Sequence, residues 1–162
     1  MWKKFLLIVI LFYLFALLQN SFFTHFSLFG TTPNLVFILF FLLVFLAKKD
    51  PPARTGSYYQ ILFFSITAGF LLDIFTYKYI GLSIIYLIII AVLLKKIQSL
   101  LQDSSENYPF IYFLPLFAIF LLAYNQAITP YLNWTILFSL AYNLIFATIF
   151  FFINKKCLKY TG

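Results

Sequence analysis

Few residues in this 162-residue chain are of the types that carry out chemistry. It has four acidic residues, one histidine and one cysteine. Their spacing gives no Ser/His/Asp set, no paired carboxylates within one apolar segment and no phosphate-binding loop. His25 has no cysteine or carboxylate near it in sequence, whereas a metal site needs several ligands. We therefore expect a protein without catalytic activity, bound metal or cofactor, and we interpret the lone Cys157 as an incidental free thiol.

Asp73 stands out because it is the only acidic residue inside a long apolar segment. Ser65 and Gly69 precede it at intervals of four residues, which places all three on one face of a helix. Small residues at this spacing let another helix backbone approach closely, and Gly81 extends that approach into the next helix. In a functional interpretation, this face is a packing surface whose polar anchor also serves a partner. In a structural one, Asp73 reaches the membrane interface, caps the short link that follows, or pairs with Lys78.

A similar stripe of small and polar residues occurs in the last apolar segment, at Ser139, Asn143 and Ala147. Asn143 falls near the middle of that segment, where an amide is expected to hydrogen-bond to another helix. We favour internal packing over ligand contact for this residue, because such interhelical bonds are a common use of polar side chains.

The composition indicates that these residues are positioned by helices in lipid. Sixty-four per cent of the residues are hydrophobic and nine per cent are charged, whereas soluble domains carry about a quarter charged residues. About 20 helical residues cross a bilayer core. We predict an all-α, polytopic membrane helix bundle, a single domain over residues 1–162 with six transmembrane helices. The predicted spans are about 4–20, 33–47, 57–75, 80–94, 109–124 and 134–154.

The segments between the spans also carry signals. The first span follows two lysines but lacks a cleavage site, so we interpret it as an uncleaved helix. Four phenylalanines between positions 22 and 29 have helix-like spacing and suggest a short segment in the outer interface. Pro115 is expected to kink the fifth helix. Residues 98–107 are expected to form a loop or a short surface helix.

The basic residues predict the orientation. With the N-terminus in the cytoplasm, all Lys and Arg residues except Lys78 fall on the cytoplasmic side, which is a strong positive-inside signal. Both termini are then cytoplasmic. The net charge of +7 is divided into small groups between apolar runs, so we expect lipid headgroup contacts and no nucleic-acid partner. The cytoplasmic residues are Lys3, Lys4, Lys48, Lys49, Arg54, Lys95, Lys96, Lys155, Lys156 and Lys159.

Two segments carry a resemblance to a known family. They are FGTTPNLVFILFFLLVF from Phe29 to Phe45 and ITAGFLLDIFTYKYIGLSIIYLI from Ile66 to Ile88, supported by the earlier LLQNSFF. Together they resemble the bacterial rod shape-determining protein MreD family, which is similar in length and helix count and has a Pro-Asp or Pro-Asn pair before its second helix. The helix-three signature resembles Gly-Phe-x-x-Asp followed by Leu-Gly or a similar pair. The matching positions here are Gly69, Phe70, Asp73 and Gly81.

The resemblance has departures. Ser65 stands where a glycine is common, and the link TYKYIG replaces one rich in Gly, Ser and Pro. Asn34 replaces the commoner Asp, and the chain after about Leu100 matches only in hydropathy.

The resemblance implies a function. Such proteins are non-catalytic scaffolds or regulators of the machinery for cell shape and lateral peptidoglycan elongation, in the bacterial inner membrane. The implied partner is an MreC-like bitopic membrane protein and, through it, an MreB-like filament and a wall synthase and transpeptidase. From the spacing alone, we expect the partner helix to lie against the face formed by Ser65, Gly69 and Asp73.

The main alternative is the substrate-binding membrane subunit of a vitamin transporter of the energy-coupling-factor type. These subunits are also small six-helix proteins that bind a ligand near the outer face. The polar residues available there are His25, Asp73, Lys78, Asn125 and Asn133. That family tends to have small residues spaced by four on its first helix, but here the first helix has only Ala16.

Overall fold

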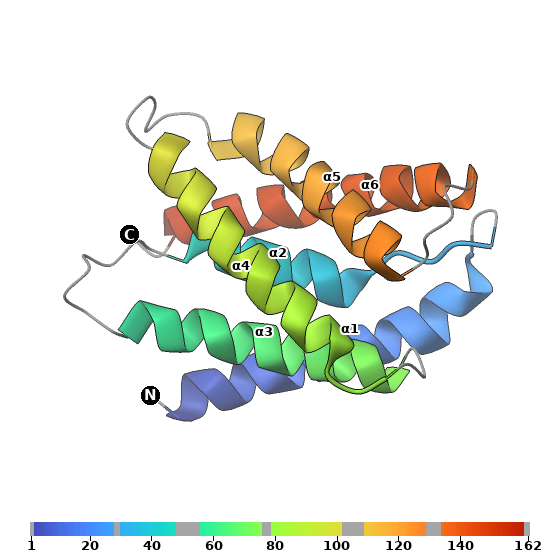
Figure 1. The fold of residues 1–162 in the computed structure, drawn as a ribbon, viewed down its shortest axis with the longest axis horizontal. Helices are drawn as coiled ribbons and strands as arrows, with labels where there is room; N and C mark the ends of the chain where they lie inside the picture. The colour runs from blue at the N-terminus through green and yellow to red at the C-terminus, as the bar shows by residue number, and fades with distance from the viewer. Residues whose placement is uncertain are drawn as a thin grey trace.

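The computed structural model describes residues 2–27, 30–47, 56–75, 79–101, 109–128 and 134–160. These residues form six α-helices, one in each predicted apolar segment, so the all-α prediction is confirmed. Successive helices run in alternating directions, and both chain termini lie at the same end of the bundle (Figure 1). The helices are α1 (Trp2–His25), α2 (Leu35–Leu46), α3 (Gly56–Phe75), α4 (Leu82–Leu101), α5 (Pro109–Ile128) and α6 (Trp134–Tyr160).

Several helix ends differ from the predicted spans. We predicted ends near residues 20, 94 and 154, but α1 continues to His25, α4 to Leu101 and α6 to Tyr160. The predicted ends followed the change from apolar to polar residues. That change ends a hydrophobic span, but it does not end a helix, because Lys and Gln are good helix formers. Phe22 and Phe23 consequently lie in the last turns of α1, and Phe29 lies outside the described residues.

Helix α2 occupies the centre of the bundle. Nine of its twelve residues are buried, and it packs against α1, α3, α4 and α6. Its Phe41 also contacts Phe117 of α5, with ring centroids 5.2 Å apart. Every other helix therefore touches α2, whose twelve residues are all apolar.

A ladder of aromatic rings joins α2 to α5. Phe45 meets Phe113 with centroids 5.2 Å apart, and Phe37 meets Tyr124, also at 5.2 Å. Lipid removes most of the hydrophobic driving force between helices, so close van der Waals contact has to replace it. Edge-to-face and offset rings provide such contact in a favourable electrostatic arrangement.

The C-terminal end of α2 is capped by side chains of α4. Lys95 Nζ donates to the carbonyl of Ala47 at 2.7 Å, and Gln98 Nε2 donates to that of Phe45 at 3.0 Å. The last carbonyls of a helix have no partner within it, and a cation near them also interacts favourably with the helix dipole. Lys95, predicted as a marker of orientation, thus has a bonding partner inside the protein, while the neighbouring Lys96 is exposed.

The other predicted orientation residues are placed only in part. Lys155 and Lys156 lie in the last turns of α6. Lys48, Lys49 and Arg54 lie outside the described residues.

Many large apolar side chains lie on the described surface, whereas four polar side chains are buried within the bundle. Leu14, Ile85 and Ile119 are among the exposed residues, while Asp73 and Asn143 are buried. Three helices are long and apolar enough to cross a membrane, at Phe5–His25, Leu82–Leu100 and Trp134–Ile153. The other three contain shorter apolar stretches, at Leu35–Leu46, Tyr59–Phe75 and Ile111–Gln126. This arrangement indicates a membrane protein.

Replacing Lys95 with Met should destabilise the bundle, because the carbonyl of Ala47 loses its partner. A buried polar group left unpaired costs about 1–3 kcal/mol, and each kcal/mol lowers the midpoint of thermal unfolding by about 2–4 °C in a chain of this size. Thermal unfolding in mild detergent, followed by circular dichroism, measures the change. Lys96→Met is the matched control and should have little effect. Equal loss in both variants would contradict the capping role.

Candidate functional site

The buried polar side chains among the described residues are Ser65, Asp73, Ser83 and Asn143. Three of them take part in hydrogen bonds at the N-terminal ends of α2 and α4: Asn143 at α2, and Asp73 and Ser83 at α4. Both helix starts lie at the end of the bundle opposite the chain termini (Figure 1). The sequence-predicted residues Asp73 and Asn143 therefore belong to two related arrangements, one at each helix start.

Asp73 caps the start of α4. It lies in the last turn of α3, and its Oδ2 accepts a hydrogen bond from the Gly81 N–H at 2.6 Å. Its Oδ1 accepts one from the Ser83 N–H at 3.0 Å. The first N–H groups of a helix need external acceptors, usually supplied by an N-cap side chain. Gly81 has no side chain that could accept a hydrogen bond, so Asp73 of the preceding helix supplies the acceptor. Capping of this link was one of the structural roles considered for Asp73 from the sequence.

Gly81 suits this turn because its φ is +106°, a backbone conformation that other residues rarely adopt. The chain there has to reverse direction within a short link and still bring the first amides of α4 onto Asp73. Lys78, the other structural explanation for Asp73, lies outside the described residues.

Gly69 lies where the backbones of α3 and α4 touch. A Cβ atom added to it would lie 2.5 Å from Cα of Ile84 and 2.6 Å from its backbone nitrogen. Contacts this short with backbone atoms cannot be relieved by moving a side chain, so the crossing of these helices requires glycine.

The two remaining predicted residues of α3, Ser65 and Phe70, differ in burial. Ser65 is buried, and its hydroxyl donates to the Ile61 carbonyl at 2.9 Å. Phe70 is 46% exposed and lies on the outer surface of α3. Because α4 of the same chain covers Gly69 and Asp73, a partner helix on this face would have to displace α4. We therefore do not place a partner there.

The Asp73 arrangement extends to α5 through two residues that the sequence did not single out. Ser83 Oγ lies 3.1 Å from the hydroxyl oxygen of Tyr124, and both residues are buried. The only sequence signal for Ser83 is its place in the first turn of α4. Tyr124 gives none, because a tyrosine near the end of an apolar segment is expected at the membrane interface.

Asn143 has the corresponding role at the start of α2. Its Oδ1 accepts a hydrogen bond from the Asn34 N–H at 2.7 Å, while its Nδ2 donates to the Ser139 carbonyl at 2.7 Å. Asn34 is itself the N-cap of α2, and its Oδ1 accepts from the Phe37 N–H at 3.0 Å. Two amide side chains, one from α6 and one local, thus serve the first amides of the central helix.

These contacts leave little polar capacity for a ligand. Within the described parts of the chain, every buried side-chain nitrogen and oxygen has a hydrogen-bond partner. The same residues contain no group of three or more His, Cys, Asp or Glu side chains placed to hold a metal. Both carboxyl oxygens of Asp73 accept hydrogen bonds from backbone N–H groups. The role of these bonds is therefore to hold the end of one helix against the start of another.

The outer residues that the transporter alternative requires are placed only in part. His25 is exposed at the end of α1, and Asn125 lies near the end of α5. Lys78 and Asn133 lie outside the described residues.

Comparison with known proteins found no family model that matches the chain, and no curated protein or solved structure similar to it.

Asp73→Leu should lower the stability of the bundle substantially, because it leaves two N–H groups at the start of α4 without acceptors, at about 1–3 kcal/mol each. Asp73→Asn retains one carbonyl oxygen and should lose roughly half as much. Thermal unfolding in mild detergent measures both losses. Phe70→Leu, an exposed change one turn earlier, is the control and should be nearly neutral. If Asp73→Leu matched Phe70→Leu, the capping role of Asp73 would be refuted.

Proposed function

We propose that this chain is a non-catalytic scaffold of the MreD type in the bacterial inner membrane. In this role it binds an MreC-like bitopic protein. Through that partner it connects an MreB-like filament with the synthase and transpeptidase of lateral wall elongation.

One observation carries the proposal. The resemblance to MreD rests on Gly69, Phe70, Asp73 and Gly81, and three of these have roles in one helical hairpin. Gly69 admits the backbone of α4, Asp73 accepts from the Gly81 N–H, and Gly81 adopts a positive φ. The signature is thus a set of packing requirements for the α3–α4 hairpin. A signature of this kind suits a protein that acts through its shape.

The distribution of polar groups supports a scaffold over an enzyme. Intramembrane catalysis or ligand binding needs polar side chains that converge on an open space. Here Asp73 and Asn143 face other helices of the same chain and bond to their backbones. The apolar outer surface suits contacts with lipid and with apolar helices of a partner.

We further propose six membrane crossings with both termini in the cytoplasm. The alternating helices bring the start of α1 and the end of α6 to one end of the bundle (Figure 1). The lysines described within helices belong to that end, including Lys3 in the first turn of α1 and Lys96 near the end of α4. Positive residues gather on the cytoplasmic side of membrane proteins. The twelve residues of α2 span only about 18 Å, so this crossing depends on the helices that surround it.

Thiol labelling tests the proposed orientation. A membrane-impermeant maleimide applied to intact spheroplasts should leave the natural Cys157 unmodified, because the C-terminus faces the cytoplasm. In a Cys157→Ser background, Ser27→Cys lies just after α1 and should be labelled. Permeabilised cells provide the control, since both cysteines should then react. Labelling of Cys157 from outside would overturn the orientation.

Affinity isolation in mild detergent, followed by mass spectrometry, tests the partner. An MreC-like protein with a single membrane span should be recovered with the tagged chain and not with an unrelated six-span protein carrying the same tag. Depletion of the chain should turn rod-shaped cells round, because lateral wall synthesis loses its scaffold. Recovery of a paired ATPase with its coupling protein would instead support the transporter alternative.

A further inference from the structure

Helix α1 presents a wide, mostly apolar face to the outside of the bundle. It is the least buried of the three helices that are long and apolar enough to cross a membrane. Lipid accounts for the exposed leucines and isoleucines of this face, because lipid tails are as apolar as they are. Lipid does not account for Tyr13 and Asn20, two polar residues that are also exposed on α1.

Tyr13 lies far from both ends of its span. It is eight residues from the start of the apolar stretch Phe5–His25 and twelve from its end, which correspond to about 12 Å and 18 Å along the axis. Its side chain is 48% exposed. Tyr124 and Tyr142 have hydroxyl partners within the chain, whereas no described residue hydrogen-bonds to the Tyr13 hydroxyl. Tyrosines favour the membrane interfaces, where water reaches the hydroxyl, so Tyr13 leaves a polar group unpaired in hydrocarbon.

Asn20 repeats this situation two turns further along α1. Its Nδ2 donates to the Ala16 carbonyl at 2.9 Å, but its Oδ1 accepts no hydrogen bond from the described part of the chain. Asn20 and Tyr13 are seven residues apart, on a line of exposed residues spaced alternately by four and three. This is the spacing at which two helices meet in a left-handed pair. The line, here called the α1 seam, consists of Leu6, Ile10, Tyr13, Leu17, Asn20 and Thr24.

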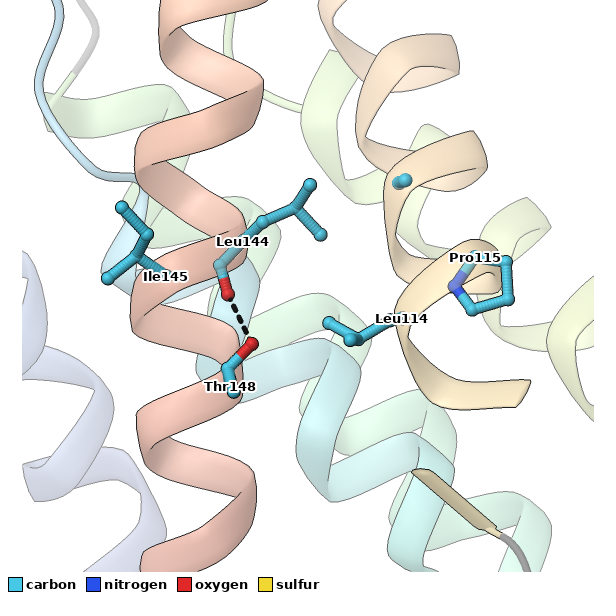
Figure 2. A pocket seen from close by; sticks show the side chains of 6 residues that line it. Leu114, Pro115, Leu144, Ile145 and Thr148 are labelled. Atoms are coloured by element: carbon cyan, nitrogen blue, oxygen red, sulfur yellow. Dashed lines mark hydrogen bonds between the residues drawn. The ribbon is translucent and has the colours of Figure 1, made fainter. Parts of the chain in front are cut away.

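The groove between α5 and α6 has no comparable polar group. Leu114 and Leu144 point into the space between these two helices (Figure 2). The one hydroxyl that lines the groove, that of Thr148, donates to the Leu144 carbonyl at 2.7 Å. Nothing in this groove calls for a polar partner, which sets it apart from the α1 seam.

We infer that the α1 seam is the contact between two copies of this chain, related by a two-fold axis along the membrane normal. Such an axis places each residue of the seam opposite itself at the same depth. Two tyrosine hydroxyls satisfy each other, because each can donate and accept a hydrogen bond, and two carboxamides do the same. The seven-residue spacing lets Tyr13 meet Tyr13 and Asn20 meet Asn20 in a single register.

A second copy fits this surface better than an unrelated membrane helix does. The second copy is inserted in the same orientation and carries the matching groups at both depths. An unrelated helix would need two suitable polar side chains with the same spacing. Even one polar residue at such a seam can specify the register of a helix pair. The inference requires a membrane but not the scaffold role, so either can fail without the other.

Disulfide cross-linking in membranes from expressing cells tests the contact. Single cysteines are introduced in a Cys157→Ser background. Tyr13→Cys and Leu17→Cys should form covalent dimers on oxidation, because a disulfide requires Cα atoms within about 7 Å of each other. Ile145→Cys is the control, because Ile145 is 58% exposed near the middle of α6 but lies outside the seam. It should remain monomeric.

The polar groups are tested by measuring association in phospholipid vesicles. Donor and acceptor fluorophores attached to Cys157 report dimers by energy transfer. Tyr13→Phe keeps the ring but removes the hydroxyl, and it should weaken association about threefold, the average effect of one interhelical hydrogen bond. Tyr13→Phe combined with Asn20→Leu should weaken it about tenfold. Tyr59→Phe changes an exposed tyrosine of α3 and should leave association unchanged.

Four outcomes overturn the inference. The first is a failure of Tyr13→Cys and Leu17→Cys to form dimers, and the second is equal cross-linking of Ile145→Cys. The third is full association of the Tyr13→Phe and Asn20→Leu double variant when circular dichroism shows it to be folded. The fourth is a cross-link from Tyr13→Cys to a different membrane protein in place of a second copy, since an unrelated helix would then occupy the seam.

Discussion

The structure depends on pairing the backbone groups at the two ends of its short central helix, α2. A bilayer core is about 30 Å thick, whereas the twelve residues of α2 extend about 18 Å. Unpaired N–H and C=O groups cost several kcal/mol each in hydrocarbon. The chain meets this constraint with side chains from other helices. Asn143 serves one end of α2, and Lys95 and Gln98 serve the other.

The same constraint explains how polar and apolar residues are distributed. A capping side chain has to point inward to reach a helix end, so Asp73 and Asn143 are buried. The outer surface is left to apolar residues, and rings such as Phe41 and Phe117 supply contact between helices. The polar interior thus determines which helix ends meet, while the aromatic ladder holds the helices together once they are aligned.

The sequence predicted the helices better than their arrangement. Hydropathy located all six segments, because each had to be apolar to suit lipid. The central position of α2 was not predicted, although all twelve of its residues are apolar, because an apolar segment can face either lipid or other helices. Predicted ends failed where lysines followed the apolar run, as at Lys95, because charge ends a span without ending a helix.

The candidate site was predictable where the contact is local in sequence. Asp73 and Gly81 are only eight positions apart, at the end of one helix and the start of the next, so capping was among the expected roles. The spacing of Gly69 indicated a close approach but not that α4 would make it. The bond from Asn34 to Asn143 joins residues 109 positions apart. No pattern in a single sequence reports such a pairing.

The cap that Asn143 provides has a consequence for biosynthesis. The ribosome completes α2 long before it reaches residue 143. The Asn34 N–H therefore lacks its acceptor, Asn143 Oδ1, while more than half of the chain is synthesised. Until α6 is synthesised, the start of the central helix lacks this hydrogen bond. A nascent or truncated chain without α6 lacks the acceptor that Asn143 provides, and the start of its central helix therefore differs from that of the finished protein.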